Sequence, residues 1–370
     1  MATNHLHDIQ AQGQAVWLDN ISRGLIEDGE LQRLVDEDGI SGVTSNPTIF
    51  EKAMGDTDRY DDAFQQTVSA GIEDPREVFF RVGEYDIRDA CDILAPVFER
   101  TEGQDGYVSF ELPPDVSDDA PGSVEMAKRL REEIGKANVL IKVPGTEAGV
   151  TAFEELTAAG VSVNVTLLFA VPRYEQIAEA YLRGLERRAE AGEPIDRVAS
   201  VASFFVSRVD TKVDAALEEK GRMDLAGKAG VANAKLAYES FTRIFSGERW
   251  ERLAARGANV QRPLWASTGT KNPEYPDTLY VDNLIGPNTV NTMPDATIEA
   301  ARDHATAART VDAGLDEAHA LIDELHEIGV PFDDIVSVEL VEQGVASFAK
   351  SFDSLMGTIE EQLRRQTARA

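Results

Sequence analysis

Short runs with alternating apolar and polar residues recur along the chain, and stretches with helical periodicity separate them. A helical stretch is clearest between Thr146, which can cap its start, and Gly160, which can end it. Strands that alternate with helices are typical of parallel βαβ units, and eight of them predict an α/β fold, a closed TIM (β/α)8 barrel. The predicted strands cover residues 15–19, 40–45, 107–112, 139–143, 161–167, 198–205, 263–267 and 278–281.

Two other sheet architectures are compatible with part of this pattern. A doubly wound sheet normally has a glycine-rich phosphate turn after its first strand, but residues 19–22 read Asp-Asn-Ile-Ser. An antiparallel sheet with one solvated face also alternates, but its strands are joined by hairpins rather than by connections long enough for helices. The barrel therefore fits the pattern best.

Two segments exceed what a minimal barrel needs. Residues 51–105 are expected to form a helical insertion, whose strongest helix begins at Asp74-Pro75. Residues 295–370 are expected to form a helical C-terminal extension that includes helices over 313–328 and 331–365. A length of 370 residues allows two or three domains at about 150 residues each. Because neither a repeat nor a linker divides the chain, we expect a single domain over residues 1–370.

Polar side chains interrupt one face of several predicted strands. Parallel strands that are buried on both faces normally read as nearly continuous apolar runs. In a barrel, the interrupted face is the lumen, and active sites lie at its carboxyl-terminal mouth. The strand parity places these polar residues on the lumenal face or at its mouth: Asp19, Asn46, Glu111, Lys142, Asn164 and Thr166.

Lys142 stands within the most hydrophobic of these strands. A single lysine in an apolar strand is most often an edge or solvent-facing residue, but its polar neighbours on the same face favour a lumenal position. Burial lowers the pKa of a lysine from about 10.4 by up to several units, which leaves free amine to attack a carbonyl. Such a lysine is suited to form a Schiff base, whose iminium accepts electrons without a metal or cofactor.

Composition limits the classes of partner. The net charge of −30 disfavours binding to nucleic acid or to an anionic membrane, since the field of the protein repels both. The sequence contains neither an apolar run of about 18 residues nor an apolar amino-terminal signal segment. One cysteine, Cys91, excludes an internal disulfide, and the five histidines lie outside the predicted strands. We therefore expect a soluble, cytoplasmic protein without a metal site or cofactor.

Seven segments together resemble the transaldolase family. The likeness follows the order of the family's motifs over nearly the whole chain, and the last segment fits its longer bacterial branch. The segments are WLDN (17–20), GVTSNPTIF (42–50), LIKVP (140–144), VNVTLLF (163–169), SFFVSR (203–208), WASTGTKNP (265–273) and NTVNTMP (288–294).

The resemblance implies a role for each catalytic residue. Lys142 would form the Schiff base with C2 of a ketose phosphate. Asp19 would take the proton of the C4 hydroxyl as the C3–C4 bond breaks, and would return it during transfer. Glu111 and Thr166 would hold the water that moves protons while the Schiff base forms. Carboxylates can accept and return protons, whereas hydroxyls and amides orient.

The resemblance also implies a substrate-binding set. Asn46 and Asn164 would bind the dihydroxyacetone unit, and Ser203 would line its pocket. The phosphate would be bound by Arg208, Ser267 and Lys271. The chain departs from the shorter transaldolases here, since Gly269 stands where they have an arginine and Lys271 is the nearest cation; Phe204 and Ser207 stand where proline and glycine are common.

The implied activity belongs to the non-oxidative pentose phosphate pathway. The enzyme would move a dihydroxyacetone unit from sedoheptulose 7-phosphate or fructose 6-phosphate to glyceraldehyde 3-phosphate or erythrose 4-phosphate, as a monomer or homodimer. One alternative is a class I fructose-6-phosphate aldolase that releases free dihydroxyacetone. In that enzyme a tyrosine commonly takes the water-holding position, so Glu111 favours the transferase. The other alternative is a non-catalytic barrel that binds sugar phosphates.

Several of these residues also have a purely structural interpretation. Asp19 can cap a helix after the first strand, Asn46 can cap the helix that Pro47 begins, and Glu111 can be a solvated strand end. Arg208 can pair with acidic residues on its own helix. Trp17 and Trp265 are expected to pack rather than to bind sugar. Two further residues can be ordinary buried hydroxyls: Thr166 and Ser203.

Overall fold

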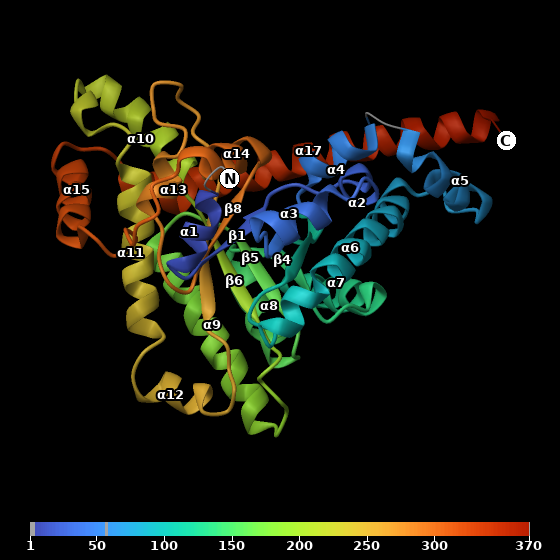
Figure 1. Cartoon of the computed structure of the whole chain (residues 1–370), viewed down its shortest axis with the longest axis horizontal. Coiled ribbons are helices and arrows are strands. Elements are labelled where there is room, and N and C mark those ends of the chain that lie inside the picture. The colour runs from blue at the N-terminus through green and yellow to red at the C-terminus, as the bar shows by residue number, and fades with distance from the viewer. Residues whose placement is uncertain (1–3, 56–57, 370) are drawn as a thin grey trace.

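Eight parallel strands form a closed barrel in sequence order, and helices surround it (Figure 1). The computed structural model describes residues 4–55 and 58–369. The arrangement confirms the prediction of a TIM barrel. The strands are β1 (Gln14–Leu18), β2 (Gly42–Thr44), β3 (Tyr107–Glu111), β4 (Val139–Pro144), β5 (Val163–Leu168), β6 (Ser200–Phe205), β7 (Gln261–Ala266) and β8 (Thr289–Met293).

Helices follow most of the strands, and further helices precede the barrel, lie in insertions between its strands or extend it at the C-terminus. In the first half of the chain they are α1 (His5–Ala11), α2 (Arg23–Glu27), α3 (Glu30–Asp38), α4 (Pro47–Gly55), α5 (Asp61–Ser69), α6 (Pro75–Arg100), α7 (Ala120–Ile134) and α8 (Glu147–Ala158). In the second half they are α9 (Val171–Glu190), α10 (Ser207–Lys220), α11 (Ala229–Ile244), α12 (Glu248–Ala254), α13 (Leu279–Asn283), α14 (Asp295–His304), α15 (Leu315–Glu327), α16 (Phe332–Asp334) and α17 (Leu340–Arg369). A π-helical turn, Ile335–Glu339, joins α16 to α17.

The prediction of the eighth strand at residues 278–281 is wrong. Leu279–Asn283 forms α13, where the Tyr280 hydroxyl donates to Asp210 at 2.9 Å and Thr278 donates to Asp282 at 2.9 Å. These tertiary and local hydrogen bonds outweigh the β-propensity of the Thr-Leu-Tyr-Val run. The barrel closes instead through β8, whose residues pair with β1 from Gln14↔Thr289 to Leu18↔Met293.

The capping signals in the sequence place the helices correctly. The Asp74 side chain accepts from the amide of Arg76 at the start of α6, and the Thr146 side chain accepts from the amide of Gly149 at the start of α8. Gly160, just beyond α8, has a φ of 80°. A left-handed residue after a helix favours glycine, which has no Cβ to clash.

Strand parity divides the barrel core as the sequence predicts. Val139, Ile141 and Val143 belong to the hydrophobic core between the sheet and the helices, while Leu140 belongs to a separate cluster in the lumen. The floor of the lumen is filled by fully or almost fully buried side chains: Trp17, Leu140, Val201, Leu264 and Val290. Trp265 faces outward and donates to the Leu284 carbonyl, so both tryptophans pack rather than line the upper cavity.

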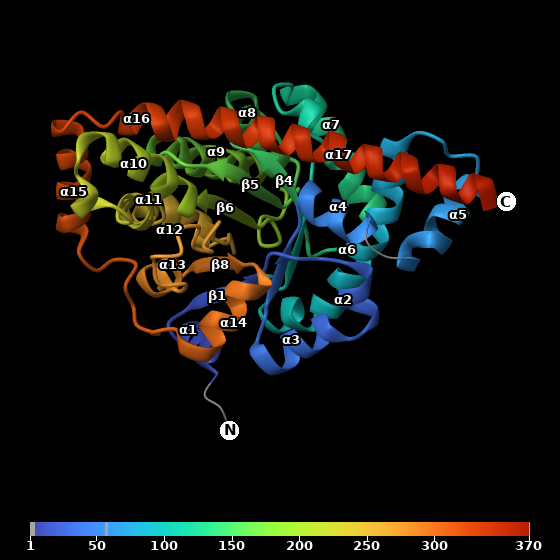
Figure 2. The ribbon, with the colours of Figure 1, turned by 90° about the horizontal axis from the view of Figure 1, so that it is seen from above.

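Helix α17 runs along the molecule from the α16 end and lies beside α4 (Figure 2). The Thr48 hydroxyl on α4 donates to Ser351 on α17 at 2.9 Å, and Ser354 donates to Glu51. Because α4 directly follows β2, these bonds place the C-terminal extension over the carboxyl-terminal mouth of the barrel. The predicted extension therefore contributes to the site described below.

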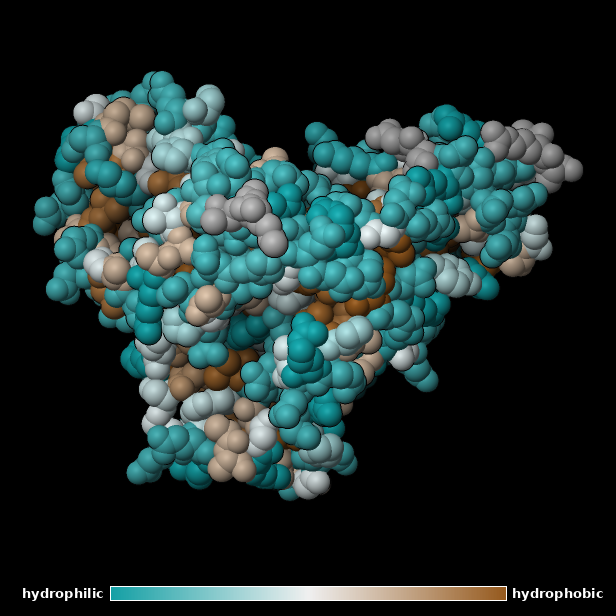
Figure 3. Space-filling model, in the orientation of Figure 1, coloured by the Kyte–Doolittle hydropathy of each residue, from teal (hydrophilic) through white to brown (hydrophobic). Residues whose placement is uncertain are grey.

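Hydrophilic residues cover most of the face shown in Figure 3. Among the described residues, the exposed large hydrophobic side chains are Tyr85, Met223 and Val338. None of the described helices combines the length with the hydropathy that a membrane span requires.

The barrel floor makes a prediction about Gly42. A Cβ at this position would lie 2.4 Å from the Trp17 indole, so Gly42→Ala is expected to destabilise the fold by about 1–3 kcal/mol. Gly357 in α17 is the matched control, since a Cβ there meets no atom within 4 Å and alanine is the better helix former. Urea denaturation measures both variants; equal midpoints for the two would contradict the close packing beneath the lumen.

Candidate active site

A cavity of about 660 Å³ opens at the carboxyl-terminal mouth of the barrel. Glu111 and Asn164 contact its lining residues from within the barrel wall, through Lys142 and Ser203 respectively. The structure therefore brings all the predicted site residues together. Those that line the cavity directly are Asp19, Asn46, Lys142, Thr166, Ser203, Arg208, Ser267 and Lys271.

Lys142 and Glu111 form a buried ion pair inside the lumen. They are register partners on β4 and β3, and Nζ of Lys142 lies 3.3 Å from Oε2 of Glu111. Nζ also donates to the Ser45 carbonyl at 2.9 Å. Lys142 is 6% exposed and Glu111 is 8% exposed, which rejects the interpretations of an edge lysine and a solvated strand end. Burial raises the pKa of Glu111, and the charge of Lys142 opposes that rise.

Asp19 extends β1 into the same cavity. Its Oδ1 accepts from the Thr44 hydroxyl at 2.7 Å, and Thr44 in turn accepts from the Thr292 hydroxyl at 2.7 Å. Burial raises the pKa of Asp19, while the Thr44 hydrogen bond and the charge of Lys142 lower it. A carboxyl with a raised pKa is suited to accept and return a proton near neutral pH. Asp19 does not cap α2, since Ser22 does so.

Thr166 offers an unused hydroxyl to the cavity. Its Oγ1 is buried and has no hydrogen-bond partner among the described residues. The next residue, Leu167, has a φ of 59°, and the β5–β6 register shifts between Val165 and Leu168. A buried hydroxyl without a partner loses free energy unless water or a ligand satisfies it. Thr166 is therefore well placed to hold a water molecule.

Asn164 and Ser203 form a hydrogen-bonded row across the lumen. The Ser203 hydroxyl donates to Oδ1 of Asn164 at 2.6 Å, and Nδ2 of Asn164 donates to the Ser109 hydroxyl at 3.0 Å. These bonds fix the orientation of the Asn164 amide. Asn46 caps α4, because its Oδ1 accepts from the amide of Ile49 at 3.0 Å, yet it still lines the cavity. The capping and ligand-binding interpretations of Asn46 are therefore compatible.

Positive charge gathers on the β6–β7 side of the cavity. The Arg208 guanidinium lies 5.0 Å from the Phe205 ring centroid. Burial lowers the pKa of Arg208, whereas the negative charges of Asp19 and Glu111 act to raise it. The acidic residues of its own helix bond elsewhere, to Tyr280 and Tyr275, which rejects the proposed helix-surface pairs. Ser267 has a φ of 57°, and its Oγ lies 2.9 Å from the Oγ of Ser207. Lys271 is exposed at the rim of the cavity.

The cavity also contains residues that the sequence analysis missed. Thr44 shares the lumenal parity of its neighbours, so the alternation pattern gave a signal for it. Lys52 on α4 and Ser347 and Phe348 on α17 line the cavity as well. Their positions depend on how two helices dock against each other, and the local sequence pattern carries no such information.

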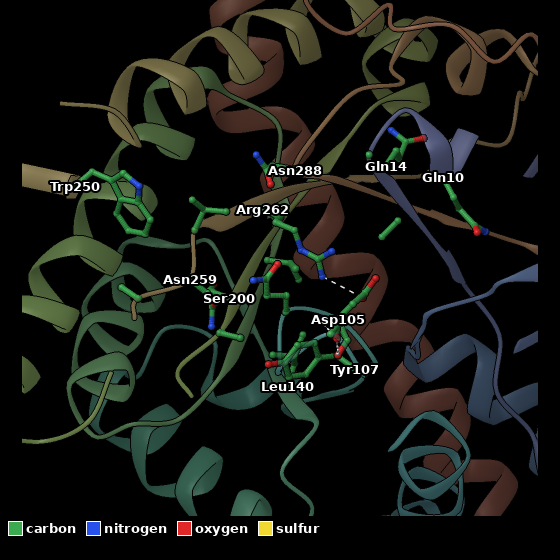
Figure 4. A pocket seen from close by; sticks show the side chains of 18 residues that line it. Gln10, Gln14, Asp105, Tyr107, Leu140, Ser200, Trp250, Asn259, Arg262 and Asn288 are labelled. Carbon is green, nitrogen blue, oxygen red and sulfur yellow. Dashed lines mark hydrogen bonds and ion pairs between the residues drawn. The ribbon is translucent and has the colours of Figure 1, made fainter. Parts of the chain in front are cut away.

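A second cavity, of about 490 Å³, lies at the opposite mouth of the barrel (Figure 4). Arg262 and Asp105 point toward one another there and form an ion pair at 3.2 Å. The Trp17 indole N–H donates to the same Asp105 oxygen at 2.9 Å. Because these charged groups satisfy one another and the lining contains no lysine, this cavity lacks the nucleophile that the upper one has.

No cluster of three or more histidine, cysteine, aspartate or glutamate side chains that could hold a metal ion occurs within residues 4–55 and 58–369. The single cysteine, Cys91, is buried on α6, away from the cavity residues. The upper cavity brings together the amine of Lys142 and the carboxyl groups of Asp19 and Glu111.

Comparison with known proteins finds relatives that align with nearly the whole chain. Residues 16–359 match the family model described as Transaldolase/Fructose-6-phosphate aldolase. A protein named Transaldolase 2 from Nostoc sp. (strain PCC 7120) is 46% identical, with 98% of this chain and 99% of the relative aligned. Proteins named Transaldolase from Trichodesmium erythraeum and Parafrankia sp. are 43% and 48% identical, over 99% and 97% of this chain and 100% and 98% of those relatives.

The Thr44 hydrogen bond makes a prediction about Asp19. Thr44→Val removes a donor to the ionised carboxylate, so the pKa of Asp19 should rise further. Carboxyl-labelled aspartate followed by NMR over a pH titration measures this shift. Thr67→Val is the control, since Thr67 is buried but bonds to the Phe64 carbonyl instead. An unchanged or lower Asp19 pKa in Thr44→Val would contradict the assigned effect of the hydroxyl.

Proposed function

Because this chain belongs to the transaldolase/fructose-6-phosphate aldolase family, we propose that it is a transaldolase that uses Lys142 as its Schiff-base residue. It is an enzyme of the transferase class and acts on sugar phosphates. The reaction moves a dihydroxyacetone unit from sedoheptulose 7-phosphate or fructose 6-phosphate to glyceraldehyde 3-phosphate or erythrose 4-phosphate. The observation that supports the residue assignment most strongly is the pair of Lys142 and Glu111 in the lumen, beside Asp19.

The first stage joins Lys142 to the donor ketose. The Nζ lone pair attacks C2, so a proton must leave the amine, and Glu111 lies 3.3 Å away with a pKa that burial raises. The carbinolamine then loses water to give the iminium. Glu111 and a water held on the free Thr166 hydroxyl carry the protons of these steps.

The second stage breaks and remakes a carbon–carbon bond. Asp19 takes the proton of the C4 hydroxyl, the C3–C4 bond breaks, and its electron pair moves into the iminium to give an enamine. The first aldose leaves as an aldehyde. The enamine carbon then attacks the aldehyde of the acceptor, Asp19 returns the proton to its oxygen, and hydrolysis of the new iminium frees Lys142.

The remaining residues bind and orient. Asn46 and Asn164 hydrogen-bond the dihydroxyacetone unit, and Ser203 holds the Asn164 amide in place. Arg208, Ser267 and the exposed Lys271 bind the phosphate. In a protein of net charge −30, a local group of cations still attracts a phosphate, because charges beyond about 8 Å are largely screened at physiological salt.

The family also includes fructose-6-phosphate aldolases, so the reaction that the enamine undergoes determines whether the activity is transfer or release of dihydroxyacetone. Glu111 in the water-holding position favours transfer over release of free dihydroxyacetone. We further propose that residues 1–370 act as one domain in the cytoplasm, as a monomer or homodimer. The iminium serves as the electron sink, so the proposed reaction needs no cofactor.

Trapping tests the central assignment. Borohydride reduction in the presence of fructose 6-phosphate should leave a covalent adduct on the peptide that contains Lys142, as read by mass spectrometry. Lys142→Met should abolish the adduct and lower transfer from fructose 6-phosphate to erythrose 4-phosphate by at least about a thousandfold. The exposed Lys128 gives the control Lys128→Met, which should behave as the wild type. An adduct on another lysine would reject the assignment.

The phosphate subsite gives a separate prediction. Arg208→Gln should raise KM for fructose 6-phosphate by about tenfold to a hundredfold, the usual effect of losing a hydrogen bond to a charged group. Lys271→Gln should have a smaller effect, because an exposed charge is well screened. Steady-state kinetics with fructose 6-phosphate and with fructose separate phosphate binding from catalysis. A similar loss with both donors would contradict the role of Arg208.

A further inference from the structure

Phe348 of α17 lies over the amine of Lys142. Its ring centroid is 5.8 Å from Nζ, and the side chain lines the active-site cavity. The same residue lines a small cavity of about 20 Å³ that also contacts Glu111. The ring therefore lies between the small cavity beside Glu111 and the open part of the site, and it covers one side of the Lys142 amine.

The surroundings of Phe348 limit access of water to Glu111 on the side of the small cavity. Most of the other residues that line the small cavity are apolar or proline, including Leu112, Pro113 and Val345. A space of this size holds at most about one water molecule. The space beside Glu111 is thus limited to about one water molecule, and the Phe348 ring lies between this space and the larger cavity.

Several contacts hold α17 in this position. Gly344 lies so close to Leu167 that a Cβ would be 2.8 Å from Leu167 Cδ2. One helical turn beyond Phe348, Ser351 accepts from Thr48 at 2.9 Å. Before α17 begins, Glu339 pairs with Lys212 at 3.3 Å. These contacts lie on both sides of Phe348, so the ring is fixed by the docking of the whole helix.

The enamine formed on Lys142 has two fates. Attack on an acceptor aldehyde gives transfer. A proton added to the enamine carbon gives instead the iminium of dihydroxyacetone, and addition of one water to C2 then breaks the C–N bond, releases dihydroxyacetone and restores the amine. Both routes start from the same intermediate, so at a given concentration of acceptor the supply of protons from solvent to the enamine carbon sets their ratio.

We propose that Phe348 is a positioning residue that favours transfer by restricting solvent around the Lys142 enamine. The inference rests on the proposed function, because it concerns an intermediate of that reaction. The Phe348 ring faces Lys142, whereas Asp19 is held by Thr44 and Arg208 lies against Phe205, so replacing Phe348 should change the fate of the enamine more than phosphate binding.

The experiment measures release against transfer. Wild type, Phe348→Ala and Phe348→Leu are incubated with fructose 6-phosphate in D2O, with and without erythrose 4-phosphate. The ratio of free dihydroxyacetone to sedoheptulose 7-phosphate should rise about tenfold in Phe348→Ala, which corresponds to 1.4 kcal/mol in the branching. The released dihydroxyacetone should carry one deuterium on carbon. Phe348→Leu keeps most of the volume and should show a smaller rise.

Phe352→Leu is the matched control. Phe352 lies on the same helix but packs against Phe79, with ring centroids 5.8 Å apart, away from Lys142. An unchanged ratio in Phe348→Ala would overturn the inference, and an equal rise in Phe352→Leu would overturn it in favour of general loosening of α17. Failure of the wild type to transfer at all would instead reject the proposed function.

Discussion

The site depends on one buried ion pair between adjacent strands. Lys142 and Glu111 are both almost completely enclosed, and each would cost several kcal/mol if it were buried without its partner. The β3–β4 register places them opposite each other, and the Ser45 carbonyl accepts a further hydrogen bond from Nζ. The charge of Lys142 also lowers the pKa of Asp19 across the lumen. The barrel therefore fixes the amine and the Glu111 carboxyl through backbone pairing, and Asp19 directly follows β1.

The two carboxyl groups differ in their surroundings, and this difference suits different tasks. Burial raises the pKa of both. Asp19 is bonded to Thr44 and remains half-buried at the cavity, where a substrate hydroxyl can reach it. Glu111 contacts Lys142 directly and faces a space for about one water. These surroundings support the proposed division of roles, in which Asp19 serves the substrate and Glu111 serves the amine.

Strand alternation predicted the fold and the lumenal residues because a period of two directly reports which face a side chain occupies. It identified Lys142 and Glu111 without tertiary information. It failed at residues 278–281, where the hydrogen bond from Tyr280 to Asp210 on the distant helix α10 outweighs the local β-propensity. It also could not find Phe348, since the position of that ring depends on contacts between α17 and α4, about 300 residues apart in the chain. The missed features share this dependence on distant contacts.

The buried side chains that fill the floor of the lumen leave the upper mouth as the route to Lys142. Within the described residues, Trp17 and Leu140 belong to a fully buried layer beneath Lys142, and the lower cavity ends against that layer. In the proposed reaction, the departing sugar and the incoming one therefore use the same upper mouth, which Arg208 and Lys271 line. Because the proposed reaction keeps the three-carbon unit covalently bound to Lys142 between its two halves, the first aldose can leave through this mouth before the second enters.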